Sequence, residues 1–303
     1  MSRRNRGFVL VNALVLVAAL SAVSLFLLAR AEGARTRLAE GQGAVQTRLY
    51  LDAFEALALS MLTADRGPVD HLGEGWATTR YTVPLDRGEV SGQLVDLQGR
   101  FNVNWLSNIE DLEAHAAFDR LLADLGLPSA RARAIIDFVT PGGRGDIAAF
   151  ARNVPAINPV GGPILMLEQL ADVPGLTGAE LARLRPYLAA LPGDATLNVN
   201  TAPARVLYSL LPGASLTAVD RLIQNRATDP FASSEALATK LASIMSADAF
   251  KELDETRFGI GSDWFHAEIA AELEGRILRR QTVFERPPPP ARVRVAYRLG
   301  ARP

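Results

Sequence analysis

Residues 8–29 read FVLVNALVLVAALSAVSLFLLA, and no charged side chain interrupts them. At about 1.5 Å of rise per residue, a helix of this length spans about 33 Å, enough to cross a hydrocarbon core about 30 Å thick. Arg3, Arg4 and Arg6 precede the stretch and Arg30 follows it. The arginines before the span predict a single-pass helix with a cytoplasmic N-terminus and an exported remainder.

A cleaved signal peptide is the first alternative for this stretch. Secretory signals have an apolar core of about 7–15 residues and then a small-residue cleavage site, which Ala29 and Ala31 imitate. The apolar run here is longer, and it continues into helix-favouring sequence over residues 31–62. We therefore favour a retained helix. An ordinary single-pass anchor, the second alternative, explains the span but not the Gly7-Phe8 pair directly before it.

That pair resembles the leader junction of type IV pilin-like proteins, in which a short basic leader ends in glycine and phenylalanine opens the apolar helix. The resemblance implies that residues 1–7 are a leader, that prepilin peptidase cuts after Gly7, and that the new amine on Phe8 is methylated. The chain departs from the pattern at Asn12, the fifth mature position, where most such proteins carry glutamate. In that family the glutamate carboxylate is thought to neutralise the N-terminal amine of a neighbouring subunit. Asparagine carries no charge, so this subunit cannot offer such a pairing.

Composition limits what the exported part can do. The chain has 303 residues, of which 49% are hydrophobic, enough for a large core or two domains beyond the anchor. Its lack of cysteine excludes disulfides and thiol chemistry. Residues 1–30 hold four arginines and no acid, which leaves 28 basic and 33 acidic side chains and a net charge of −5 in the remainder. A mildly acidic domain fits nucleic acid poorly, so we expect no nucleic-acid partner.

The segment after the membrane span predicts a helical stem over residues 30–62. Apolar residues recur there at helical spacing, namely Leu38, Val45, Leu49, Ala53, Leu57 and Met61. We expect this half of the helix to pack on a sheet, as in a pilin. Gly41 and Gly43 lower helix propensity in the middle, so a local bend is expected there.

Strand-like alternation occurs in two separate regions of the chain. The first contains residues 78–85, 89–97 and 99–104, and the second contains residues 264–273, 277–286 and 291–299. Pro287 to Pro290 form a stiff link within the second region. One antiparallel sheet built from both regions predicts an α+β fold, with sheet parts at 63–104 and 259–303 and a helical insert at 105–258.

The insert reads as repeated helical hairpins, a SAM-like arrangement. Residues 121–139, 167–188 and 207–226 each combine a helix, a glycine-containing turn and a second helix. Thr177 and Glu180 are spaced as a capping box. Asn102-Val103-Asn104 is echoed by Asn198-Val199-Asn200. Because asparagine favours turns and helix caps, we interpret both echoes as element boundaries rather than active sites.

Helical hairpins also suggest DNA binding, in which turn amides contact phosphates beside basic residues. The turns at 173–175 and 211–213 have no adjacent basic residue, and Asp172 precedes the first. We therefore favour structural hairpins. A membrane-anchored helix-hairpin-helix DNA receptor of the competence type stays as an alternative.

Catalytic and metal-binding patterns are weak. His71, His115 and His266 are scattered, and the chain has no Walker A, GxSxG or HExxH motif, so we do not expect an enzyme. His71 lies near Asp70 and Glu74, where we favour a solvated acidic loop over a metal site. Asp137 and Asp146 flank a Pro-Gly-Gly loop and are candidate calcium ligands, although no EF-hand spacing is present. We expect no other cofactor.

The later sequence resembles the K-type minor pseudopilins of type II secretion systems. The similarity lies in VDLQGRFNVNWL (95–106), IIDFV (135–139), PILMLEQLADVPGL (163–176), RPYLAALP (185–192), LNVNTAPARVLYSLLPG (197–213), Phe231 with Ser233 and Ser234, and GSDWFHAEI (261–269). The usual acidic loop is reduced here to TPGGRGD (140–146), which weakens any implied calcium binding.

This resemblance implies a structural subunit anchored in the bacterial inner membrane, with its C-terminal part in the periplasm. It implies a place at the pseudopilus tip, where the subunit helps to start assembly and to export folded proteins across the outer membrane. Its implied partners are the I- and J-type minor pseudopilins, and further the major pseudopilin and secreted substrates. A minor pilin of a type IV pilus is the remaining alternative.

Overall fold

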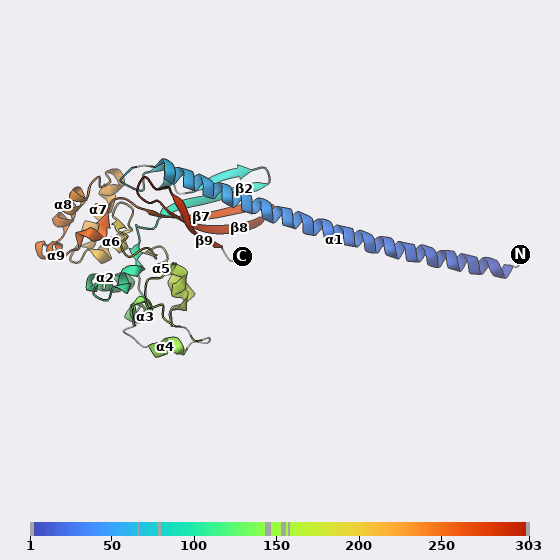
Figure 1. Ribbon diagram of the computed structural model, residues 1–303, viewed down its shortest axis with the longest axis horizontal. Coiled ribbons are helices and arrows are strands. Elements are labelled where there is room, and N and C mark those ends of the chain that lie inside the picture. Colours follow the sequence, from blue (N-terminus) through green and yellow to red (C-terminus); the bar gives the residue numbers. More distant parts are fainter. Residues whose placement is uncertain are drawn as a thin grey trace.

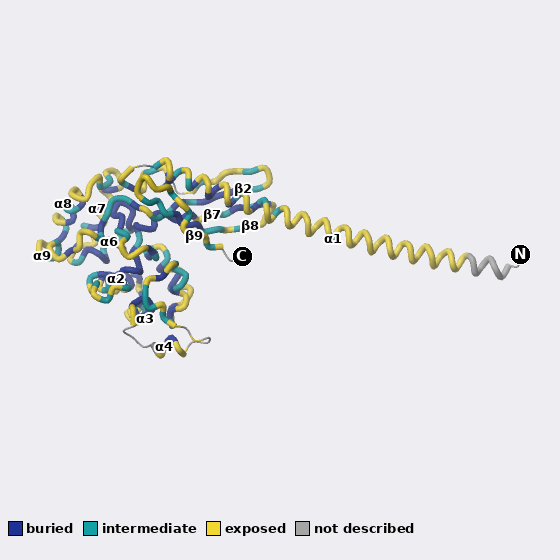
Figure 2. Tube along the Cα trace, in the orientation of Figure 1, coloured by how far each residue is buried: buried dark blue, intermediate teal, exposed yellow. Residues whose placement is uncertain are grey.

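The longest element is one helix, α1 (Arg3–Ala64), in a computed structural model that describes residues 3–65, 67–77, 80–142, 147–152, 156 and 158–300 (Figure 1). Its 62 residues extend about 93 Å. The helix continues without a break through Gly41 and Gly43. Its N-terminal half projects alone, and its other half lies on the rest of the protein (Figure 2).

Five antiparallel strands form the main sheet in the order β1-β2-β7-β8-β9. They are β1 (Tyr81–Leu85), β2 (Gly88–Asp96), β7 (Trp264–Leu273), β8 (Arg276–Glu285) and β9 (Arg294–Gly300). The central pair joins the two distant regions, with Asp96 opposite Phe265. Immediately beyond this pair, the Leu97 amide donates to the Trp264 carbonyl at 3.0 Å. The chain therefore leaves the sheet and returns to it at adjacent points.

The second half of α1 covers one face of the sheet. Leu51, Phe54 and Leu62 are buried there against residues that include Phe265 and Phe284. This buried stripe is not the one expected from the sequence. Of the predicted stripe, Leu38, Val45, Leu49 and Leu57 are exposed by 64%, 57%, 54% and 40%. The helix carries apolar residues on two faces, and periodicity alone does not tell which face meets the sheet.

The insert is mainly helical and has its own core around Phe101, Phe118 and Phe138. Its α-helices are α2 (Leu112–Asp124), α3 (Ser129–Val139), α4 (Ile147–Ala151), α5 (Gly178–Leu184), α6 (Ala204–Leu210), α7 (Leu216–Thr228), α8 (Ser234–Ile244) and α9 (Ala247–Lys251). Short 3-10 helices are η1 (Gly75–Ala77), which lies before the sheet, and η2 (Val103–Ser107), η3 (Leu167–Asp172) and η4 (Glu255–Arg257). The expected α+β fold with a helical insert is confirmed.

One predicted strand is not part of the main sheet. Within residues 99–104, only Phe101–Asn102 (β3) is extended, and it pairs in parallel with β4 (Leu188–Ala189) inside the insert. The physical reason is the Asn102 side chain, which accepts a hydrogen bond from the Asn104 amide and starts η2. A similar parallel pair joins β5 (Leu197–Asn198) to β6 (Phe258–Gly259).

Candidate functional site

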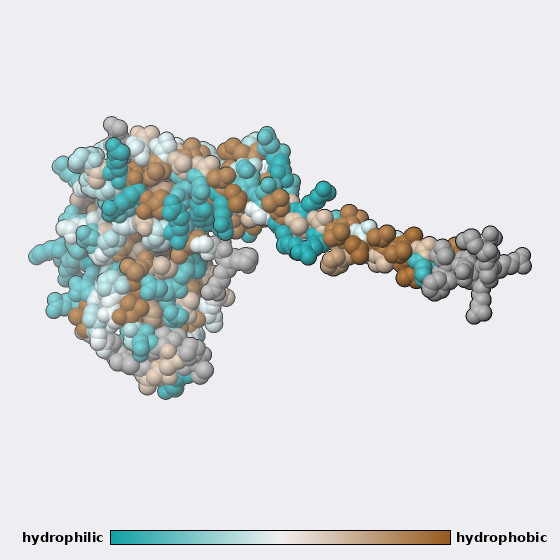
Figure 3. Space-filling view, turned by 45° about the vertical axis from the view of Figure 1, so that its right-hand side comes forward, coloured by the Kyte–Doolittle hydropathy of each residue, from teal (hydrophilic) through white to brown (hydrophobic). Residues whose placement is uncertain are grey.

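The exposed half of α1 is apolar on all sides. Leu14, Leu20 and Phe26 are exposed by 71%, 66% and 64%, and hydrophobic surface follows this part of the helix (Figure 3). The span Leu10–Ala64 contains a window of mean hydropathy 2.5 with no buried residue. Such a helix fits a single-pass membrane anchor.

The residues predicted for processing and assembly all lie in this helix. Gly7 and Phe8 are helical in backbone, and Asn12 is exposed on the apolar segment. Cleavage after Gly7, methylation of Phe8 and the role of Asn12 stay predictions.

A buried carboxylate ties α1 to the sheet. Glu55 accepts hydrogen bonds from Arg298 Nε at 2.8 Å and from Thr282 Oγ1 at 2.9 Å, and Arg280 lies at 3.6 Å. Burial by itself would raise the pKa of Glu55, but these donors and the two positive charges outweigh it, so the pKa is lowered. The sequence analysis did not single out Glu55, because its partners Thr282 and Arg298 lie more than 200 positions away.

The three helical hairpins turn at glycines with left-handed backbone. Gly126, Gly175 and Gly213 have φ values of 71°, 75° and 79°, which other residues adopt with strain. The predicted capping box is confirmed, since Thr177 and Glu180 cap each other at the start of α5. Basic side chains near these turns have protein partners. Arg131 pairs with Glu180 at 3.1 Å, and Arg183 donates to the Leu125 carbonyl at 3.2 Å.

The two Asn-Val-Asn segments form the same local structure, which confirms that they mark boundaries. Asn102 accepts from the Asn104 amide at 3.1 Å, and Asn198 accepts from the Asn200 amide at 2.9 Å. The second asparagine of each pair bonds the backbone of a distant residue, donating through Nδ2 and accepting through Oδ1. Asn104 bonds the amide and carbonyl of Ile164, and Asn200 bonds those of Phe231. The insert therefore contains two similar units, from β3 to β4 and from β5 to β6.

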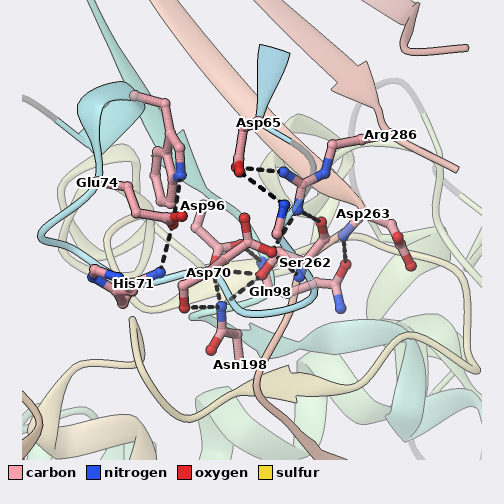
Figure 4. A network of polar contacts seen from close by, with 12 residues as sticks. Asp65, Asp70, His71, Glu74, Asp96, Gln98, Asn198, Ser262, Asp263 and Arg286 are labelled. Atoms are coloured by element: carbon pink, nitrogen blue, oxygen red, sulfur yellow. Dashed lines mark hydrogen bonds and ion pairs between the residues drawn. The ribbon is translucent and has the colours of Figure 1, made fainter. Parts of the chain in front are cut away.

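Asp96 is the centre of a polar network where the second unit meets the sheet (Figure 4). Its Oδ2 accepts from Thr201 Oγ1 at 2.5 Å, Ser262 Oγ at 2.7 Å and Asn198 Nδ2 at 3.1 Å. Its Oδ1 accepts from the Gln98 amide at 2.7 Å. Burial raises the pKa of Asp96, and these hydrogen bonds oppose the rise. The network joins β2 and β7 to the insert.

Arg286, at the end of β8, connects the same network to α1. Its guanidinium donates to Asp65 at 2.7 Å and to Asp70 at 2.5 Å, and it lies over the Phe265 ring at 4.8 Å. Burial raises the pKa of Asp70 to about 6, although the bonds from Arg286 and from the Ser262 amide pull it down. The end of α1, the sheet and the insert therefore meet in one buried joint.

The acidic loop predicted at residues 70–74 is part of this joint and is not solvated as expected. Asp70 is 1% exposed, and Asp65, Asp70 and Glu74 bring carboxylate oxygens within 4.8 Å of one another. Asp70 accepts from Arg286 and from the Ser262 amide, and the half-buried Glu74 accepts from Trp76 Nε1 at 2.9 Å and from the His71 amide at 2.8 Å. With Arg286 already bound to the two aspartates, we interpret the group as structural.

The structure keeps the three histidines apart. His71 Nδ1 accepts from the Gly73 amide at 3.1 Å, His115 Nε2 lies 3.1 Å from the Leu106 carbonyl, and His266 lies on β7. Asp137 is buried near the end of α3, and Asp146 lies outside the described residues. Sequence reasoning missed Asp65, Asp96 and Arg286, because their importance comes from contacts between residues more than 100 positions apart.

An exposed apolar helix, a pilin-like sheet and a buried polar joint to a helical insert define a membrane-anchored, pilin-like subunit. Models of type II secretion system protein K match residues 99–193 and 197–260, ranges that correspond to the two units of the insert. Protein K of Pseudomonas aeruginosa is 31% identical over 244 residues, covering 73% of each chain, and that of Aeromonas hydrophila is 26% identical over 313 residues, covering 94% of each. The chain belongs to the type II secretion system protein K family.

A solved structure shows the same fold. A chain in the crystal structure of the GspK-GspI-GspJ complex from enterotoxigenic Escherichia coli superposes with a TM-score of 0.75 at 20% identity, covering 88% of this chain and 100% of that chain. The protein is thus a minor pseudopilin of type II secretion, a structural component of the apparatus. The DNA-receptor and type IV pilin alternatives are not favoured.

Proposed function

We propose that this subunit occupies the tip of the pseudopilus, where it helps to start assembly and to export folded proteins across the outer membrane. The observation that carries the proposal is the position of the insert. The sheet and both units of the insert gather at the end of α1 opposite its N-terminus, and the insert extends sideways from the sheet (Figure 1). A mass of this size would obstruct a subunit stacked above it.

Asn12 supports the same placement. The mature fifth position lacks a carboxylate, so it offers no charge to the amine of another subunit. A subunit at the end of a filament has no neighbour on one side, so it has one fewer N-terminal amine to neutralise. We therefore propose that Asn12 suits a terminal position.

The second apolar face of α1 supports a partner assignment. Val45 and Leu49 are more than half exposed, at 57% and 54%, although they lie beyond the membrane-spanning part of the helix. Exposed apolar stripes of this kind mark protein contacts. We propose that helices of the I- and J-type minor pseudopilins cover this face, since the similar solved structure is a complex with GspI and GspJ.

The N-terminal arginines support a membrane topology in which the N-terminus lies in the cytoplasm. With Arg3, Arg4 and Arg6 held in the cytoplasm, the sheet and insert lie in the periplasm. Prepilin peptidase then meets Gly7 on the cytoplasmic side and cuts after it. Replacing Gly7 with valine should leave the precursor uncut on a gel. Normal processing of that variant contradicts the leader assignment.

We further propose that the subunit has no catalytic role and binds no nucleic acid. Arg131 and Arg183, next to the turn glycines, are engaged with Glu180 and the Leu125 carbonyl. Calcium near Asp137 is a separate proposal that rests on this carboxylate and on the sequence of the following loop. A calcium-dependent rise in unfolding temperature that Asp137→Asn abolishes would support it.

The test of the tip complex uses full-length chains. We would co-express this protein with the I- and J-type minor pseudopilins of the same secretion system and purify it by an affinity tag. Recovery of both partners supports the assignment. The double variant Val45→Ser with Leu49→Ser should lose them, while the control Arg48→Ser should retain them. Full recovery by the double variant contradicts the proposed contact face.

The role of position 12 has its own test. Asn12→Ala should secrete substrate normally, because the proposal requires no charge there. A severe secretion defect with normal protein levels would argue against it.

A further inference from the structure

A polar cleft lies where the open face of the sheet meets the insert. Its volume is about 300 Å³, at the small end of ligand-binding pockets. His266, Val283 and Tyr297 form part of its floor as direct neighbours on β7, β8 and β9. Because Phe265 and Ala267 face the core under α1, His266 between them points to the opposite face. Its wall comes from η3 and from residues 185–190.

Arg100 also lines the cleft, and it forms no direct ion pair among the described residues. It lies in the VDLQGRFNVNWL run, whose asparagines cap turns, a role that does not involve the arginine. Its guanidinium donates to the Arg185 carbonyl at 3.0 Å. Glu268 and Asp96 attract Arg100 from beyond ion-pair distance, but burial outweighs their effect and lowers its pKa. Four of its five N–H donors are therefore available to another group.

His266 is the second group that lacks a partner. It is 8% exposed, and its Nδ1 has no hydrogen-bond partner among the described residues. Burial lowers the pKa of His266 to about 4, so the ring is neutral at neutral pH and offers one N–H and one acceptor nitrogen. A buried polar nitrogen without a partner is costly, and in the tautomer that protonates Nδ1 a ligand that accepts this N–H removes that cost.

The other charged groups of the cleft are already engaged. Arg185 pairs with Glu168 at 2.5 Å, and Glu268 accepts from Gln93 Nε2 at 3.1 Å. Tyr297 stays protonated, because burial raises its pKa. Among the cations and the imidazole of the cleft, Arg100 and His266 are therefore the groups without a carboxylate partner.

We propose that this cleft binds a peptide carboxylate, held by the guanidinium of Arg100 and the imidazole of His266. A carboxylate matches the planar, multiple N–H donors of arginine. The apolar side chains of Leu97, Val283 and Leu299 also line the cleft and suit the carbon atoms of the adjoining residue. A chain terminus and an acidic side chain provide the same chemistry. The inference does not depend on placement at the filament tip.

The test is calorimetric titration of the full-length protein in detergent micelles with three probes. The first is N-acetyl-trialanine with a free C-terminal carboxylate, the second is its C-terminal amide, and the third is that amide with aspartate as the middle residue. We expect binding of the first or third probe and not of the second. Binding of the first identifies a chain terminus, and binding of the third identifies an acidic side chain.

Arg100→Gln should weaken binding about 10- to 100-fold, the usual effect of losing a charged hydrogen bond. The control is Arg120→Gln, because Arg120 is also half-buried and donates to a carbonyl, that of Ser209, at 2.9 Å. It lies on α2, outside the cleft, and should leave binding unchanged. Gln281→Glu on the cleft floor keeps Arg100 in place and should block the probe with its own carboxylate. Binding of no probe, equal binding of the amide, or full binding by folded Arg100→Gln overturns the proposal.

Discussion

The two Asn-Val-Asn segments have the same sequence and the same turn, but their first asparagines have different partners. Asn102 uses its side chain within the insert, donating to the Pro192 carbonyl at 2.7 Å and accepting from the Leu191 amide at 3.1 Å. Asn198 donates to the Asp70 carbonyl, the Asp96 carboxylate and the Ser262 hydroxyl, which all lie outside its own unit. One segment closes its own unit, and the other attaches its unit to the sheet.

A local motif thus determines the conformation of a turn, but it does not determine which part of the protein the turn binds. The two segments should therefore contribute differently to the free energy of unfolding, because only the second binds a buried carboxylate. Asp96 is buried and accepts hydrogen bonds from Asn198 and Thr201. Removing one of several donors from a buried carboxylate costs more than removing a neutral contact. Four predictions test this contrast.

The largest effect is expected for Asn198→Ala. The variant loses the turn bond to the Asn200 amide and leaves Asp96 short of a donor, so the free energy of unfolding should fall by about 3–4 kcal/mol. Urea titration of the full-length protein in micelles, followed by tryptophan fluorescence, measures it. A loss below that of Asn102→Ala would remove the distinction between the segments.

Asn102→Ala should have an intermediate effect. It breaks the equivalent turn and two neutral backbone contacts, without exposing a carboxylate to an apolar interior. We expect a loss of about 2 kcal/mol in the same titration. Secretion should be retained, because the joint between insert and sheet is intact. A secretion defect larger than that of Asn198→Ala contradicts the assignment of the joint.

The joint should also respond to pH through Asp70, whereas the effect of breaking the Asn102 turn should not depend on pH. The pKa of Asp70 in the folded protein is about 6, above the value of about 3.9 for an unfolded aspartate. The folded state therefore holds this proton more tightly, and the stabilisation is present at low pH and lost as the pH rises through 6.

Asp70→Asn cannot lose a proton, so its stability relative to the wild type should increase from about pH 4 to about pH 7. Urea titrations at several pH values measure the difference. The difference between Asn102→Ala and the wild type should stay constant over that range. A constant difference for Asp70→Asn as well would show that Asp70 does not titrate there.

The smallest effects are expected at two matching helix caps. Thr177 caps α5 in the first unit, and Ser246 caps α9 in the second by accepting from the Ala249 amide at 3.3 Å. Each alanine variant should lose about 1 kcal/mol. Thr177→Ala should lose more, because it also breaks the contacts of Glu180 with Thr177 Oγ1 at 2.9 Å. Thermal unfolding of both variants compares them, and a larger loss for Ser246→Ala would be contrary to expectation.

Features that depend on neighbouring residues could be predicted from the sequence. The apolar run of α1, the glycine turns and the Thr177 cap are local, since each is determined within a few residues. The asparagine echoes were likewise interpreted correctly as boundaries. The order of the motifs after the Gly7-Phe8 pair was sufficient to identify the family.

Features that depend on packing could not be predicted. Two apolar faces on α1 made the covered face ambiguous, and Glu55 is buried only because the distant Thr282 and Arg298 bind it. Residues 99–104 alternate in character as a strand does, yet the Asn102 side chain caps η2 and ends the strand after two residues. Arg286 reaches Asp65 and Asp70 across more than 200 positions, a distance over which no spacing rule applies.

The hydrogen bond from the Leu97 amide to the Trp264 carbonyl has a consequence for how such a protein can arise and be rebuilt. Asp96 and Phe265 face each other in adjacent antiparallel strands, so a two-residue turn, the shortest hairpin connection, is enough to join them. The whole insert is thus a module placed at the tip of one hairpin. Removing or exchanging the module at that point leaves the pairing of β2 with β7 intact, so this hairpin tip is the place to rebuild the protein.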